Sequence, residues 1–277
     1  MNTPFVSTEW LASRLPDPNV AIIDASWYLP TANRRPHEEY LAGHIPGAVF
    51  FDIDAIADRS SGLPHMLPTP EAFAREVGAL GIGDGMTIVI YDEAGLFSAS
   101  RVWWEFRIMG APDIRILQGG GAKWRAEGRP IEAGAAQPEP AIFTPAFQPD
   151  LVRTREQVVS AIASNTQIAD ARPGGRFAGR DPEPRPGLPS GHMRGAVSLP
   201  ALELVRDGEL KPAAELKAMF DAVGLDLDKP VITSCGSGVT AATLMLALEL
   251  TGARDVALYD GSWAEWASWP GSEIVTE

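Results

Sequence analysis

Four short segments of this 277-residue chain occur twice, in the same order. The recurring pairs are GHIPGA (43–48) and GHMRGA (191–196), IIDAS (22–26) and IADAR (168–172), IVIYDEAG (88–95) and VITSCGSG (231–238), and ILQGGGAKW (116–124) and LYDGSWAEW (258–266). Because four segments recur in order at nearly constant spacing, the chain is predicted to fold as two copies of one structural unit.

Each copy has a sequence pattern typical of an α/β unit. Short apolar runs such as Ile88–Tyr91, Val231–Thr233 and Val256–Tyr259 are typical of buried parallel strands. Helix-length stretches lie between such runs, for example at 70–80 and 240–250. Strands that alternate with helices predict, in each domain, a mainly parallel sheet with helices on both faces.

The two copies are separated by a proline-rich stretch. It contains Pro138, Pro140, Pro145 and Pro149, and prolines at this density favour an extended linker over a folded element. We therefore predict a first domain over residues 1–130, a linker over 131–150 and a second domain over 151–277.

The second copy carries the only cysteine, Cys235. An apolar strand is predicted to end at Thr233, and a helix to begin near Thr240 or Ala241. Glycines at Gly236 and Gly238 let successive N–H groups turn inward as an anion-binding nest, to which the helix N-terminus adds partial positive charge. The pattern favours a thiolate and predicts a nucleophile for anionic substrates. We expect the substrate to contact the loop residues Gly236, Gly238, Val239 and Thr240. The alternative is a buried structural cysteine.

Charge and cysteine count exclude several classes of function. A net charge of −13 argues against nucleic acid or an anionic membrane as a partner, and no apolar run is long enough to span a membrane. A single cysteine excludes an internal disulfide and any multi-cysteine metal site. We expect neither a metal nor a cofactor, and a reducing, cytoplasmic location.

With the repeat, the loop CGSGVTA and the segments DASWYLP (24–30), PHMLP (64–68) and YDGSWAEW (259–266), the chain resembles the tandem-domain rhodanese superfamily, and within it the 3-mercaptopyruvate sulfurtransferases. The resemblance implies that only the second domain is catalytic, and Asp92 indeed occupies the position of Cys235 in the first copy. It also implies that Cys235 takes sulfur from 3-mercaptopyruvate as a persulfide, releases pyruvate, and passes the sulfur to a thiol, a thioredoxin-like protein or cyanide.

A group of arginines reverses the local charge. Residues 171–194 hold five arginines against two acidic residues. The resemblance implies that two of them, Arg176 and Arg185, bind the carboxylate and ketone of the substrate. In the alternative, these arginines pair with acidic neighbours, and for Arg172, Arg180 and Arg194 such a structural role is expected.

Ser237 lies two residues after the cysteine, where its hydroxyl can donate a hydrogen bond to sulfur or to a forming enolate. The resemblance implies that it works with a histidine of the first domain, for which we expect His44. His192 holds the equivalent place in the second copy, where a structural role is expected. No acidic residue is assigned to this relay, and His65 has no partners at metal-ligand spacing.

Three other functions compete with this one. A thiosulfate:cyanide sulfurtransferase differs only in its donor; such enzymes usually have basic residues after the cysteine, where this chain has Gly236 and Ser237. A cysteine phosphatase needs an arginine six residues after the cysteine, and Ala241 stands there. A non-catalytic partner-binding module of this family usually loses the cysteine.

Overall fold

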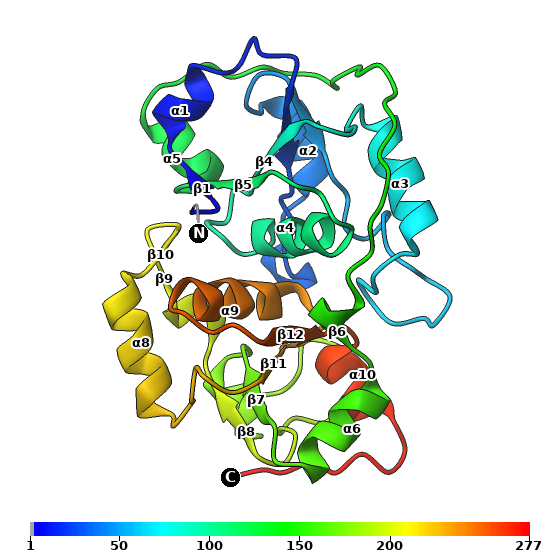
Figure 1. Ribbon diagram of the computed structural model, residues 1–277, viewed down its shortest axis with the longest axis vertical. Coiled ribbons are helices and arrows are strands. Elements are labelled where there is room, and N and C mark those ends of the chain that lie inside the picture. The colour runs from blue at the N-terminus through cyan, green and yellow to red at the C-terminus, as the bar shows by residue number, and fades with distance from the viewer. Residues whose placement is uncertain (1–2) are drawn as a thin grey trace. The chain divides into compact units, whose positions relative to one another are not determined.

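The computed structural model describes residues 3–277, which divide into two compact units (Figure 1). Unit 1 comprises residues 3–58, 67–148 and 207–209, and unit 2 comprises residues 59–66, 149–206 and 210–277. Each unit holds one copy of the repeat. Residues 59–66, which the predicted boundaries place in the first domain, belong to unit 2 by their contacts.

Unit 1 is built on a five-stranded sheet of order β1-β5-β4-β2-β3, in which every recorded pairing is parallel. Figure 1 shows its helices around this sheet. The elements are β1 (Phe5–Val6), α1 (Thr8–Ala12), β2 (Val20–Asp24), a 3-10 turn (Pro30–Ala32), α2 (Pro36–Ala42), β3 (Ala48–Phe50), α3 (Pro70–Ala79), β4 (Thr87–Tyr91), α4 (Ala99–Ile108), β5 (Ile114–Leu117) and α5 (Gly120–Ala126).

Unit 2 repeats the architecture with a sheet of order β6-β12-β11-β7-β8, again parallel throughout its recorded pairings. Its elements are a 3-10 turn (Pro149–Leu151), β6 (Val152–Arg153), α6 (Arg155–Ala163), β7 (Gln167–Asp170), α7 (Gly174–Phe177), β8 (Ala196–Ser198), a 3-10 turn (Ala201–Glu203), the paired short strands β9 (Val205–Arg206) and β10 (Glu209–Leu210), α8 (Ala213–Ala222), β11 (Val231–Ser234), α9 (Val239–Leu250), β12 (Val256–Tyr259) and α10 (Ser262–Ser268).

Helices cover both faces of the unit 2 sheet. On one face, Val158 of α6 and Trp263 and Trp266 of α10 pack with Ile232 of β11 in one buried cluster. On the other face lies α9, which is apolar on nearly every side and buried along most of its length, as expected of a central helix (Figure 1). The predicted α/β fold, with mainly parallel sheets covered on both faces, is confirmed.

The proline-rich stretch has no helix or strand between α5 and the turn at Pro149, as its composition predicts. It is nevertheless fastened along unit 1. The Ala141 N–H donates to the Gly78 carbonyl at 2.9 Å, the Ala146 N–H donates to the Met109 carbonyl at 2.8 Å, and Phe143 is buried. In the part of the chain that the structure describes, no helix is both long and apolar enough to cross a membrane.

Candidate active site

Cys235 lies directly after β11 and four residues before the start of α9, and only 2% of it is exposed. Its backbone is held on both sides by the β12–α10 corner. The Cys235 N–H donates to the Ser262 hydroxyl at 3.1 Å, and its carbonyl accepts from the Trp263 N–H at 2.9 Å. Ser262 itself has a positive φ of 50°, a strained backbone conformation that often marks functional positions. The loop is therefore fixed to the carboxyl end of the sheet.

Gly236 and Gly238 have different roles in the loop. Gly238 is the N-cap of α9 and lies in the left-handed region, with φ 78°, which glycine adopts readily. The helix begins at Val239, one residue before the predicted start near Thr240 or Ala241. Gly236 has no positive φ; a Cβ there would lie 3.7 Å from Arg185 Nη1, so its small size leaves space beside that guanidinium. Val239 and Thr240 form the first turn of α9, where backbone N–H groups have no partner within the helix.

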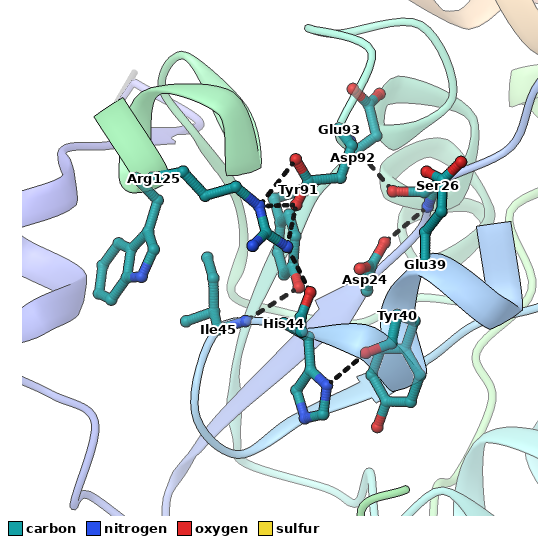
Figure 2. Close-up of polar contacts among 12 residues, drawn as sticks. Asp24, Ser26, Glu39, Tyr40, His44, Ile45, Tyr91, Asp92, Glu93 and Arg125 are labelled. Carbon is teal, nitrogen blue, oxygen red and sulfur yellow. Dashed lines mark hydrogen bonds and ion pairs between the residues drawn. The ribbon is translucent and has the colours of Figure 1, made fainter. Parts of the chain in front are cut away.

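Unit 1 shows what this loop position binds. Asp92, labelled in Figure 2, is the counterpart of Cys235 and is buried. Its Oδ1 accepts N–H bonds from Ala94 and Leu96 at 3.1 and 3.0 Å, and its Oδ2 accepts from Phe97, Ser98 and Ala99 at 2.8 Å each. Five backbone N–H groups thus donate to one carboxyl group, and the Asp92 side chain fills the loop of the first copy.

The Ser237 hydroxyl is the centre of a polar cluster in unit 2. Its Oγ lies 2.9 Å from Nδ1 of His65 and 3.1 Å from Nη2 of Arg185. Ser237 and His65 are both buried. His65 holds a left-handed backbone with φ 58°, which for a non-glycine residue costs roughly 1–3 kcal/mol. A strained, buried histidine bonded to the hydroxyl next to the cysteine loop is suited to proton transfer.

The histidine expected to work with Ser237, His44, has a different environment. Its Nδ1 lies 2.8 Å from the Tyr40 carbonyl, and its ring stacks on Tyr40 with centroids 4.0 Å apart (Figure 2). His192 repeats this arrangement, with Nδ1 2.9 Å from the Phe177 carbonyl and its ring 3.9 Å from that of Phe177. Both histidines therefore stabilise the same turn, at the GHxxGA segment of each copy. The structure thus shows His65, rather than the expected His44, in contact with Ser237.

The five arginines of residues 171–194 differ in their contacts. Arg172 is buried, grips Asp170 at 2.6 Å, and donates to Glu183 at 2.7 Å. Arg176 reaches the other oxygen of Glu183 at a longer 3.4 Å. The exposed pairs Arg180–Glu277 and Arg194–Glu273 lie at the surface. Arg185 is the arginine of this group that touches the cysteine loop, through Ser237.

The sequence alone predicts no catalytic role for His65. A usable signal existed, because His44 and His192 share the repeated GHxxGA segment whereas PHMLP (64–68) has no counterpart in the second copy. A histidine present in both copies is expected to stabilise the fold that the copies share. A histidine present in only one copy is the better candidate for a catalytic role.

Comparison with known proteins agrees with this geometry. The family model of the rhodanese-like domain matches residues 7–127 and 154–268. The chain is 48% identical over 268 residues to the 3-mercaptopyruvate sulfurtransferase of Escherichia coli K12, covering 96% of this chain and 95% of that protein. It is 45% identical over 270 residues to bovine thiosulfate sulfurtransferase, covering 94% and 91%. The crystal structure of SseA from Escherichia coli, a 3-mercaptopyruvate sulfotransferase with the rhodanese fold, superposes with a TM-score of 0.88 at 46% identity, covering 95% of this chain and 99% of that one.

Proposed function

The chain belongs to the rhodanese family, and on that premise we propose that it is a sulfurtransferase that moves the sulfur of 3-mercaptopyruvate onto Cys235 and then to an acceptor. The observation that carries this proposal is the Ser237 hydroxyl, bonded to both His65 and Arg185 two residues after the cysteine. That arrangement supplies a proton path and a positive charge where an enolate would form.

In the first half-reaction, the Cys235 thiolate attacks the sulfur of 3-mercaptopyruvate. A sulfur–sulfur bond forms, the carbon–sulfur bond breaks, and its electron pair passes to the enolate of pyruvate. A proton from His65, relayed by the Ser237 hydroxyl, converts that enolate to pyruvate. The thiol proton of the donor returns to the Ser237–His65 relay and replaces the proton given to the enolate. Cys235 is then left as a persulfide anion, and the backbone donors of the loop hold the charge on its outer sulfur.

Arg185 and Arg176 are proposed to hold the substrate. Arg185 touches Ser237 and lies beside Gly236, which suits it to the oxygens nearest the reacting sulfur. Arg176 has one longer ion pair, to Glu183 at 3.4 Å, and retains donors for a carboxylate. The loop residues Gly236, Gly238, Val239 and Thr240 are proposed to contact the same substrate through their backbone.

In the second half-reaction, an external nucleophile attacks the outer sulfur and returns the Cys235 thiolate. With one cysteine, the chain cannot resolve its persulfide as an internal disulfide. We therefore propose a thiol, a thioredoxin-like protein or cyanide as the acceptor, and a reducing compartment such as the cytoplasm as the location.

The donor is tested by mixing the reduced protein separately with 3-mercaptopyruvate and with thiosulfate, then measuring intact mass over time. One added sulfur atom per chain is expected from 3-mercaptopyruvate, because the neutral Gly236 and Ser237 suit a singly charged donor. Thiosulfate is the second donor tested, because the chain is also similar to a bovine thiosulfate sulfurtransferase. Faster loading from thiosulfate would reverse the donor assignment, and loading from neither donor would end the sulfurtransferase proposal.

Replacing His65 with asparagine is expected to lower kcat for pyruvate release by about a hundredfold, because the relay loses its proton donor. Asparagine tolerates a left-handed backbone, so the fold should be retained. His44→Asn is the matched control: it should lower the melting temperature, because the contacts of His44 are internal to unit 1, yet leave turnover per folded molecule nearly unchanged. Equal turnover by the His65 variant and wild type would remove His65 from the chemistry.

A further inference from the structure

Unit 1 contains a cavity of about 410 Å³ that the proposed sulfur transfer does not use. Its lining includes three carboxylates and two arginines, namely Asp24, Glu39, Glu93, Arg34 and Arg125, together with Ser26. Figure 2 shows Asp24 between the Arg125–Glu93 pair and Glu39. A cavity of this volume is large enough for a small organic ligand.

Two large side chains of unit 2 are replaced by small ones in unit 1, and one of the small residues, Ser26, lines the cavity. Ser26 stands at the position of Arg172: the Ser26 N–H donates to Asp24 Oδ1 at 2.9 Å, as the Arg172 N–H does to Asp170 Oδ1. Gly121 stands at the position of Trp263: its N–H donates to the Asp92 carbonyl at 3.0 Å, as the Trp263 N–H does to that of Cys235.

In unit 2 these two side chains neutralise a buried carboxylate. Arg172 donates to both oxygens of Asp170, at distances from 2.6 to 3.1 Å, and its guanidinium lies 4.0 Å from the Trp263 ring. A planar guanidinium thus fills the space in front of Asp170, with one face covered by an indole.

In unit 1 the equivalent carboxylate, Asp24, is 2% exposed and has no ion pair within the described residues. It accepts a bond from the Ser26 N–H and interacts with the Tyr91 hydroxyl. Burial raises the pKa of Asp24 above its usual value, these bonds lower it in part, and the charge of Asp92 raises it further. Asp24 therefore faces the cavity without a cationic partner among the described residues, and a cation bound there would stabilise its ionised form.

The two arginines of the lining already have acidic partners. Arg125 pairs with Glu93 at 3.2 Å and donates to the Gly43 carbonyl, while Arg34 pairs with Glu39. Among the described residues, Asp24 is therefore the carboxyl group of this lining that has no guanidinium partner.

We propose that this cavity binds the guanidinium group of a small ligand on the Asp24 carboxylate, in the position that Arg172 fills in unit 2. The match is geometric as well as electrostatic, because a planar guanidinium can donate two parallel bonds to one carboxylate, whereas an ammonium acts as a point charge. The ligand is a small molecule with net positive charge, since the rest of the wall is balanced.

The test is a titration of the isotope-labelled full-length protein with methylguanidinium chloride at constant ionic strength, followed by the amide signals of Ser26 and Gly43 in NMR spectra. Saturable shifts of these signals are expected. Methylammonium chloride is the second ligand and should bind at least about tenfold more weakly, the loss of one charge-assisted bond. Equal affinity for the two cations, or no saturable shift with methylguanidinium, would overturn the proposal.

Two variants locate the binding. Asp24→Asn keeps an acceptor for the Ser26 N–H but removes the charge, and should weaken methylguanidinium binding at least about tenfold. Ser26→Arg places a guanidinium in the cavity and should abolish binding even if the first variant proves unstable. Glu139→Gln, an exposed change in the same unit, is the matched control and should bind as wild type does. Unchanged binding in the folded Ser26→Arg variant would contradict the assignment. Since sulfur loading of Cys235 is not measured, these outcomes are independent of the proposed function.

Discussion

Replacing Cys235 with serine is expected to reduce pyruvate release from 3-mercaptopyruvate by at least about a thousandfold, to the uncatalysed background. A serine hydroxyl is not ionised near neutral pH and cannot carry a transferable sulfur atom, and the chain has no other cysteine to replace it. The fold should persist, because the exchange alters one buried atom in a loop fixed by backbone bonds to Ser262 and Trp263.

The measurement combines pyruvate release with intact mass after exposure to the donor. The variant should gain no sulfur, while wild type gains one atom at Cys235. Ser237→Ala is the matched control within the same loop: it retains the nucleophile and should still gain sulfur, but more slowly, because the His65 relay is broken. Persistent sulfur gain by the cysteine variant would place the carrier elsewhere and contradict the mechanism.

Much of the architecture could be read from the sequence because it rests on repetition and periodicity. The apolar runs at Val231 and Val256 became adjacent parallel strands, and the Gly238 position became the left-handed N-cap of α9. These are local consequences of residue type. The attachment of residues 59–66 to unit 2 is a non-local packing outcome that no short-range pattern contains.

From the sequence, the contacts of the site could be predicted only for residues that are close together along the chain. Cys235 and Ser237 share one loop, so their proximity is fixed by covalent connection. His65 comes to Ser237 from 172 residues away in sequence, and the choice between it and His44 needed coordinates. The arginine group shows the same limit, because composition cannot distinguish Arg172, locked between Asp170 and Glu183, from Arg185 at the loop.

Replacing Arg172 with methionine is expected to lower the free energy of unfolding of unit 2 by about 3–5 kcal/mol, because it leaves the buried Asp170 without its partner and leaves Glu183 with only the longer pair to Arg176. Burial alone would lower the pKa of Arg172, but the two carboxylates raise it above its usual value, so the guanidinium is strongly retained as a cation. Methionine fills similar space beside Trp263 and cannot supply that charge.

Urea unfolding followed by tryptophan fluorescence measures this loss, and Arg194→Met is the matched control. Arg194 pairs with Glu273 at the surface, where such pairs contribute about 0–1 kcal/mol. A loss no larger than that of the Arg194 variant would show that the buried carboxylates do not depend on Arg172.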